Sequence, residues 1–276
     1  VVIGVGRGDA CLAQLGLAPA PLGPFDRFLD HLAKYLTGVS VPLGELAADG
    51  YRPVSDMGVA EVPEGSTLQR LDDSVPVVPV DVAATGPKVI GIGARRSRHV
   101  SFTVGADEER IRKAIETARA ARETAGLNPD ELSFGAYVNV VCHDDIEVAR
   151  RVAASGVSIF SRFSAMYGKA QAGVGAAAAA SLEKLSAAYD VRHHGELDAG
   201  HNGAVDLDFM NRFAIVGSPG YCAERLARLE KLGLDRVVVM SGLDDGSAET
   251  ARQVRECREA LDNGVLPLPA RHEVAR

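Results

Sequence analysis

The chain has 276 residues, of which 46% are hydrophobic and 24% charged, the composition of an ordinary soluble globular protein. Thirty Lys and Arg against 37 Asp and Glu give a formal net charge of −7. Since no basic run stands out, this balance argues against a polyanion-binding surface, and we expect no nucleic-acid partner. No stretch reaches the ~20 apolar residues that a membrane helix needs, so we also expect no membrane partner.

The cysteines are few and widely spaced, and none belongs to a C-x-x-C pair: Cys11, Cys142, Cys222 and Cys257. This usage indicates reduced thiols rather than a disulfide framework or a zinc site. Cys142 and Cys222 fall on apolar faces, where a cysteine is more often a packing residue than a nucleophile. No secretory signal pattern is evident, and we predict a cytoplasmic protein.

The first half of the chain predicts three strands, a long loop and a helix. Residues 1–5, 77–82 and 99–103 are short β-branched runs, apolar on both faces for most of their length, as strands covered on two sides must be. Between the first two strands, residues 40–76 hold four prolines without a sustained period, which predicts a loop insertion that could fold over a site. Residues 107–125 repeat apolar side chains every three or four positions, which predicts a surface helix.

The second half continues the alternation of strands and helices. Residues 132–141 and 236–240 are the remaining predicted strands. Residues 158–208 form a second insertion, mainly helical, with an alanine-rich helix from Gly175 to about Tyr189. The pair Ser218-Pro219 followed by Gly233 predicts a helix with an N-cap, a proline at its first position and a glycine stop.

Strands alternating with helices are typical of βα units on a parallel sheet. Two architectures fit the residues: an open doubly wound sheet, or part of a (β/α)8 barrel. A barrel needs eight units of ~30 residues, and the two insertions leave room for about five. The pattern alone leaves both folds open.

Polar residues follow two predicted strands, at the edge where parallel α/β folds hold their ligands. After the first strand, Gly4-x-Gly6-x-Gly8-Asp9 departs from the dinucleotide fingerprint G-x-G-x-x-G and can equally be a tight glycine turn. Arg7 and Asp9 favour a site, because two charges at the end of a buried strand are badly placed for a core.

Two further segments can bind an anion. Residues 80–88, VDVAATGPK, join a strand to a helix through a small-residue turn, whose free N–H groups and helix dipole suit a phosphate. The alternative for this turn is a plain N-cap by Thr85. Arg212 precedes the helix start at Ser218 and can clamp a phosphate, or else pair with Asp206 or Asp208 on the surface.

The histidines point to no metal. His193, His194 and His201 lie in a glycine-containing stretch without a carboxylate or cysteine at ligand spacing, and we predict no metal site. His143 precedes Asp144-Asp145, which reads as a helix start with acidic residues in its first turn.

Four segments together resemble the luciferase-like family of flavin- and deazaflavin-dependent oxidoreductases. Residues 2–9, VIGVGRGD, resemble the family's G-x-G-x-G-[DE] strand end, and residues 79–87, PVDVAATGP, resemble its strand ending in A-A-[ST]-G-P. Residues 211–219, NRFAIVGSP, resemble its R-[FW]-x-[IV]-x-[GS] helix entry, and residues 233–239 are similar to its last strand. The subgroup most similar is the actinobacterial enzymes that use coenzyme F420, often named for methylenetetrahydromethanopterin reductase.

The resemblance implies a luciferase-like (β/α)8 TIM barrel, represented here by about strands four to eight, with an insertion after strand seven. Residues 1–276 would then form a single N-terminally truncated domain, since three βα units of ~30 residues each are expected before the first strand. We expect exposed edges at the first and last strands, a site with one wall absent, and a homodimer in the full-length form.

The resemblance also implies hydride transfer between coenzyme F420 and a small organic substrate at the C-terminal face. Its catalytic residue would be Asp9, near the deazaflavin ring or the substrate. The predicted cofactor-binding residues are those that the resemblance implies, together with their neighbours in sequence: Arg7, Gly8, Ala83, Ala84, Thr85, Gly86, Thr103 and Arg212. Some F420 enzymes carry a lysine where this chain has Ala106. Lys88 would supply the positive charge that this position lacks. The alternatives are an FMN-dependent luciferase-like monooxygenase and an inactive fragment or binding scaffold.

Overall fold

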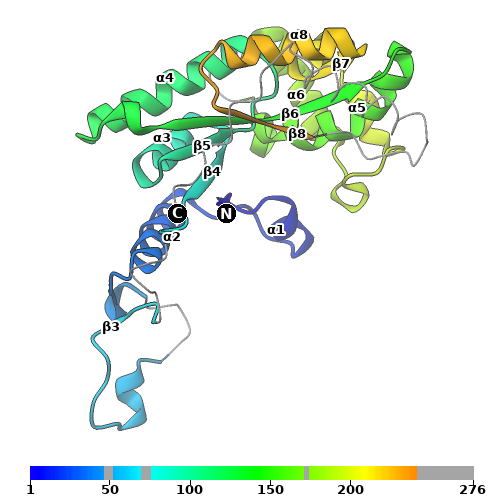
Figure 1. Cartoon of the computed structure of the whole chain (residues 1–276). Helices are drawn as coiled ribbons and strands as arrows, with labels where there is room; N and C mark the ends of the chain where they lie inside the picture. The colour runs from blue at the N-terminus through cyan, green and yellow to red at the C-terminus, as the bar shows by residue number, and fades with distance from the viewer. Residues whose placement is uncertain (47–51, 70–75, 171–173, 241–276) are drawn as a thin grey trace.

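A curved parallel sheet of six strands forms the centre of the structure (Figure 1). The computed structural model describes residues 1–46, 52–69, 76–170 and 174–240. The sheet contains β1 (Ile3–Val5), β4 (Val80–Ala84), β5 (His99–Phe102), β6 (Ser133–Cys142), β7 (Ile215–Gly217) and β8 (Arg236–Met240). The strand order is β1-β4-β5-β6-β7, and β8 pairs with β6. The described strands therefore form a half-barrel, as the resemblance implied, and do not close into a ring.

Helices cover the convex side of this sheet and flank its ends (Figure 1). They are α1 (Ala10–Gln14), α2 (Leu22–Leu36), α3 (Pro87–Arg96), α4 (Glu108–Thr124), α5 (Ile146–Ser161), α6 (Ala176–Ala188), α7 (Leu207–Phe213) and α8 (Pro219–Glu230). Short 3-10 helices are η1 (Leu43–Glu45), η2 (Val54–Met57), η3 (Pro129–Glu131), η4 (Arg162–Gly168), η5 (Val191–His193) and η6 (Gly200–Ala204).

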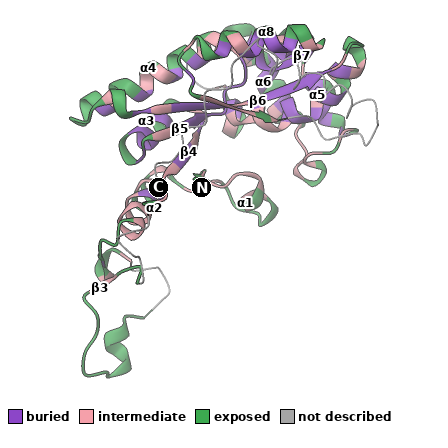
Figure 2. Ribbon diagram, in the orientation of Figure 1, coloured by how far each residue is buried: buried purple, intermediate pink, exposed green. Residues whose placement is uncertain are grey.

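The convex face of the sheet carries the main hydrophobic core. Side chains alternate between the two faces of a strand, so every second residue of β5 and β6 points to the helices. Buried residues of this face pack against α3, α4 and α8: Val100, Phe102, Phe134, Ala136, Val138, Ile90, Ile111, Ala118, Leu226 and Leu229. Figure 2 shows the buried residues gathered along the sheet and the helices above it.

The opposite face of the same strands is polar. Asp81 of β4 accepts a hydrogen bond from Ser101 Oγ at 2.7 Å and pairs with Arg236 of β8 at 2.9 Å. Arg236 also lies 3.4 Å from His99 Nδ1. The other Asp81 oxygen, Oδ1, is buried without a hydrogen-bond partner among the described residues. This network connects strands at both sides of the half-barrel through their concave face.

The first strand was predicted to be buried on both faces, but in the structure it is largely exposed. Val1 is fully exposed, Val2 is 53% exposed, and no residue of β1 is buried. Among the described strands β1 pairs only with β4, in the register Val5 opposite Val82, so only one of its edges is covered. The exposed edge that the resemblance implied is therefore present.

The predicted loop at 40–76 is largely irregular in its described part. It holds a two-residue antiparallel pair, β2 (Val41–Pro42) with β3 (Gly65–Ser66), in addition to η1 and η2. Figure 1 shows this segment projecting away from the sheet, beyond α2. The predicted helices at 107–125, 175–189 and 218–233 correspond to α4, α6 and α8, each within three residues at either end.

A close backbone approach joins the loop after β5 to the end of α7. Gly105 adopts a φ of +75°, and a Cβ built on it would clash with the Phe213 carbonyl oxygen. The neighbouring Ala106 N–H donates to that same oxygen at 2.7 Å. A side chain at position 105 would therefore push these two segments apart.

We predict that Gly105→Ala destabilises the protein much more than Gly126→Ala. Gly126 also has a left-handed φ, +71°, but a Cβ there would meet nothing within 4 Å. Gly126→Ala should lower the free energy of unfolding by about 1 kcal/mol from backbone strain alone. Gly105→Ala should lower it by roughly 2 kcal/mol more, because the clash is added to the strain. Urea unfolding of both variants measures the difference, and equal losses would contradict the close approach.

Candidate functional site

A cavity of about 570 Å³ lies at the carboxyl ends of β1, β4 and β5. Seven of the nine predicted site residues line it: Arg7, Gly8, Asp9, Ala83, Thr85, Gly86 and Thr103. They come together because the three strands are parallel and adjacent, so their carboxyl ends meet at one edge of the sheet. Apolar side chains that also line the cavity include Pro19, Leu22, and Phe163 and Met166 of η4.

Two predicted residues lie elsewhere. Ala84 is 2% exposed in the core, where its carbonyl oxygen accepts a hydrogen bond from the Thr103 N–H at 2.9 Å. Arg212 is exposed in the last turn of α7 and does not line the cavity. Asp206 caps the same helix by accepting from the Phe209 N–H at 2.7 Å. The cofactor contacts of Ala84 and Arg212 stay predictions.

The turn after β4 has the form of an anion site. Gly86, and not Thr85, is the N-cap of α3, and no side chain caps this helix. The Thr85 hydroxyl instead contacts the Thr103 hydroxyl across the strand ends, so the interpretation of Thr85 as a plain N-cap is wrong. The N–H groups of the first turn of α3 are therefore left uncapped beside the cavity.

Lys88 adds a cation to this turn. It lies in the first turn of α3, where a positive side chain is unfavourable because the helix dipole is also positive there. Lys88 is exposed, lines the cavity, and forms no ion pair within the described residues. A bound anion would remove this repulsion. The helix terminus, Lys88 and the two threonine hydroxyls thus make one end of the cavity suited to a phosphate.

Asp9 lies elsewhere on the cavity wall and is paired. Its Oδ2 accepts a hydrogen bond from Arg162 Nη2, which belongs to η4 in the second predicted insertion. The two side chains are 17% and 13% exposed. One carboxylate oxygen of Asp9 is thus engaged by a cation that comes from a segment 153 residues away.

Aromatic rings hold Arg162 in place. Its guanidinium lies 5.4 Å from the ring centre of Phe163 and 4.6 Å from that of Tyr189. Tyr189 in turn donates to or accepts from His194 Nδ1 at 2.6 Å and packs on the His201 ring at 4.2 Å. Sequence reasoning missed Arg162 and Tyr189, since neither belongs to a motif and their contacts are distant in sequence.

Burial shifts the pKa values of the side chains around Arg162 and of the nearby Arg110. It raises the pKa of Tyr189 and lowers the pKa values of His194 and His201, which favours neutral imidazoles. Burial also lowers the pKa of Arg110 to about 10. Arg110 donates to the Val104 carbonyl at 3.1 Å and to Ser164 Oγ at 2.5 Å, and so joins the loop after β5 to η4.

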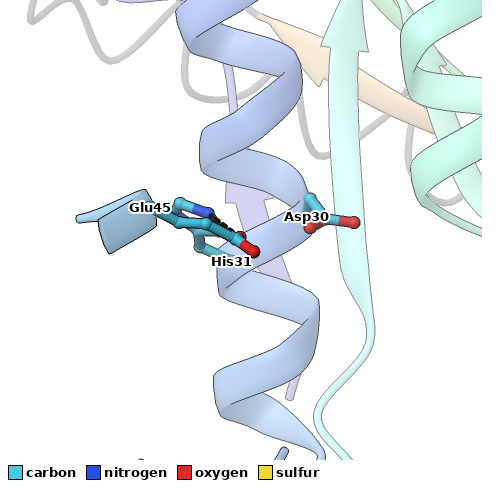
Figure 3. A group of neighbouring side chains, drawn as sticks. All are labelled: Asp30, His31 and Glu45. Atoms are coloured by element: carbon cyan, nitrogen blue, oxygen red, sulfur yellow. Dashed lines mark hydrogen bonds and ion pairs between the residues drawn. The ribbon is translucent and has the colours of Figure 1, made fainter. Parts of the chain in front are cut away.

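One group of possible metal ligands lies outside the cavity. Asp30 and His31 of α2 and Glu45 of η1 have ligand atoms within 4.8 Å of one another (Figure 3). Lys34 pairs with Asp30 at 2.9 Å and with Glu45 at 3.3 Å, while Arg96 pairs with Asp30 at 2.6 Å. These cations already neutralise the carboxylates, so the geometry is that of a surface ion-pair cluster.

The buried cysteines contribute to packing, as predicted. Cys142 and Cys222 are 4% and 0% exposed in the convex core, and Cys222 Sγ lies 3.4 Å from the Gly217 carbonyl oxygen. Cys257 lies outside the described residues. Asp145 caps α5 by accepting from the N–H groups of Glu147 and Val148, which confirms the helix start predicted after His143.

The model of a family described as luciferase-like monooxygenase matches residues 1–236. The solved structure of a coenzyme F420-dependent tetrahydromethanopterin reductase from Methanopyrus kandleri is similar over 92% of this chain and 72% of its own, with TM-score 0.58 and 20% identity. An F420-dependent secondary alcohol dehydrogenase in complex with an F420-acetone adduct is similar over 95% and 69%, with TM-score 0.61 and 15% identity.

A riboflavin lyase structure with modified FMN and riboflavin is similar over 95% of this chain and 62% of its own, with TM-score 0.50 and 15% identity. No match was found among curated proteins. At these identities the structures show a common fold. No helix in the described part of the chain is long and apolar enough to cross a membrane.

We predict that stability falls as the pH drops from 7.5 to 5, partly through His201. A histidine titrates near 6.5 in an unfolded chain, whereas burial lowers the pKa of His201 in the folded protein. The contribution of His201 to the free energy of unfolding is therefore fully present above its pKa in the unfolded chain. It is lost as the pH falls through its pKa in the folded protein. His201→Gln should lose less stability over this interval than the parent chain in urea unfolding. If the free energy of unfolding fell equally with pH in the two proteins, the prediction would be contradicted.

Proposed function

Because the chain belongs to the luciferase-like monooxygenase family, we propose that it is an oxidoreductase that transfers a hydride between coenzyme F420 and a small organic substrate. The observation that carries this proposal is the cavity itself, which gathers Asp9 with the strand-end residues of the expected cofactor site. The F420-dependent proteins of similar fold support the choice of cofactor. A cytoplasmic location, and a homodimer in the full-length form, belong to the same proposal.

The residues present fit the anionic part of the cofactor. The uncapped N-terminus of α3, Lys88 and the paired hydroxyls of Thr85 and Thr103 would hold a phosphate. Ala106 is 0% exposed, and its N–H is bound to Phe213, so position 106 does not contribute to this site. Lys88 reaches the cavity from the neighbouring helix and supplies the charge that position 106 lacks.

When bound, the deazaflavin would supply or accept the hydride, and the protein's task is to orient the partners and exclude water. Phe163, Met166, Pro19 and Leu22 give the cavity apolar walls that suit this exclusion. Asp9 is the acidic side chain of the wall, and we assign it to orienting the substrate or handling its proton. The pairing with Arg162 fixes one of its oxygens and leaves the other for this task.

The alternative within the family is an FMN-dependent monooxygenase. The family's description and the FMN-containing riboflavin lyase of similar fold favour it. A phosphate site at α3 serves either cofactor, because FMN also ends in a phosphate. A chain without activity, acting as a binding scaffold or fragment, is the remaining alternative.

Titration of the purified chain with oxidised F420 and with FMN, followed by fluorescence, separates these proposals. Binding of F420 at micromolar concentration with much weaker binding of FMN would support the first proposal, and the reverse preference the second. Failure to bind either cofactor would favour the scaffold. Oxidation of reduced F420 in the presence of small carbonyl or unsaturated compounds then tests hydride transfer itself.

We predict that Lys88→Ala and Thr103→Val each weaken binding of the preferred cofactor by about tenfold, because each removes one contact to a charged phosphate. Lys113→Ala is the matched control. Lys113 pairs with Glu109 at 2.6 Å on α4 and does not line the cavity. If Lys88→Ala and Lys113→Ala weakened cofactor binding equally, the effect would come from a general loss of positive charge. That result would rule out the proposed phosphate site.

A further inference from the structure

Arg7 is held in the loop after β1 by Ala20. The Arg7 side chain donates from Nε to the Ala20 carbonyl oxygen at 2.7 Å, and the Ala20 N–H donates to the Arg7 carbonyl oxygen at 3.0 Å. One residue therefore fixes both the backbone and the side chain of Arg7. Because a guanidinium is planar, the bond at Nε also restricts the directions in which Nη1 and Nη2 can point.

The two Nη groups of Arg7 have no hydrogen-bond or ion-pair partner in the described part of the chain, although the side chain is partly buried and lines the cavity. Arg96, Arg122 and Arg162, by contrast, each pair with a carboxylate. A shortage of acidic residues does not explain the difference, since the chain has a net charge of −7. A cation that is partly withdrawn from water without a counter-ion is unfavourable, and a ligand can supply the missing anion.

The charges around the cavity leave an excess of positive charge. Arg7, Asp9 and Lys88 are the charged residues that line it. The carboxylate of Asp9 is already engaged by Arg162. Arg7 and Lys88 face no carboxylate among the described residues, so the cavity offers two cations to a ligand.

These two cations belong to different parts of the cavity. Arg7 follows β1, which pairs with β4 on one side, whereas Thr103 follows β5, which pairs with β4 on the other. Neighbouring strands lie ~4.8 Å apart, so about 10 Å separates β1 from β5. An anion bound between the hydroxyls of Thr85 and Thr103 is therefore on the opposite side of β4 from Arg7. This separation favours a second anionic group as the ligand of Arg7.

We propose that Arg7 binds the carboxylate of the substrate, and that the substrate is a small carboxylic acid with an apolar remainder. With Nε bound to Ala20, both Nη groups can donate to one carboxylate, the paired arrangement that a guanidinium favours. Leu22, Phe163 and Met166 line the same cavity and suit an alkyl or aryl remainder. The assignment to a substrate rests on the proposed function, and it moves Arg7 from the cofactor-binding residues to the substrate-binding ones.

The first experiment measures the dissociation constants of 2-oxohexanoate and 2-hexanone for the full chain by titration calorimetry. The two probes differ only in a carboxylate that replaces a methyl group. The parent chain should bind 2-oxohexanoate about tenfold more tightly. Arg7→Gln keeps an N–H donor for the Ala20 carbonyl and removes the charge, and it should bring the ratio close to one. Equal binding of the two probes by the parent would overturn the proposal.

Two further variants show what part of Arg7 matters. Arg7→Lys should give an intermediate ratio, since it keeps the charge and loses the planar fork. Arg119→Gln is the matched control, because Arg119 pairs with Asp130 at 3.0 Å on α4 and does not line the cavity. It should keep the tenfold ratio of the parent. If Arg119→Gln lowered the ratio as much as Arg7→Gln, a general loss of charge would explain both, and the proposal would be wrong.

The second experiment separates substrate from cofactor. The dissociation constant of oxidised F420, or of FMN if FMN binds better, is measured by fluorescence. Arg7→Gln should change it less than twofold, whereas Lys88→Ala should raise it about tenfold and leave the preference for 2-oxohexanoate intact. A tenfold loss of cofactor affinity in Arg7→Gln, with that preference kept, would assign Arg7 to the cofactor. A preference lost in Lys88→Ala and kept in Arg7→Gln would place the carboxylate at α3. Either result overturns the proposal.

The two experiments also distinguish this inference from the proposed function. If the parent chain binds neither F420 nor FMN, the proposed function fails, and the ratio of the two probes still decides whether Arg7 binds a carboxylate. If the parent binds a cofactor but shows no preference for 2-oxohexanoate, the role of Arg7 alone is refuted.

Discussion

The in-register parallel pairing of β1, β4 and β5 is the constraint on which the candidate site depends. β4 and β5 end opposite each other at Ala84 and Phe102, and β1 ends two residues earlier along β4, at Val5 opposite Val82, so the three strands leave the sheet at one edge. Each continues into a short polar or glycine-rich turn, and the turns surround one cavity. A shift of one residue in either pairing would move these side chains to the other face of the sheet. The hydrophobic core behind the strands, centred on Phe102 and Phe134, fixes that register.

The cavity also needs a wall that the βα repeat does not provide. That wall comes from η4, where Ala165, Met166 and Tyr167 leave helical geometry. Tyr167 has a φ of +67°, the one non-glycine residue of the described chain in the left-handed region. Strain of this kind is held in place by surrounding contacts, here those of Arg110 with Ser164 and of Arg162 with its aromatic neighbours. The insertion thus contributes a rigid surface to the cavity.

Local patterns predicted the parts of the structure that local physics determines. The period of α4 and the proline start of α8 needed no distant contact, and the charged residues Arg7 and Asp9 after the first strand indicated the site, whereas Thr103 came only from the family resemblance. The bounds of helix α2 were not predicted; its Pro24 lies in the first turn, where no N–H is needed. The Thr85 contact with Thr103 and the pairing of Arg162 with Asp9 required the folded chain, because the partners are 18 and 153 residues apart.

The open edge of the half-barrel has a consequence for how the protein behaves in solution. Unpaired strand edges are templates on which other chains can add, and long flat apolar edges nucleate aggregates. β1 spans three residues with Gly4 at its centre, and a glycine in a strand adds backbone freedom and no side chain for packing. The concave face beside β1 carries the charged pair Asp81 and Arg236 instead of an apolar surface. The described strands therefore form an open sheet whose first edge is a poor template for uncontrolled sheet growth.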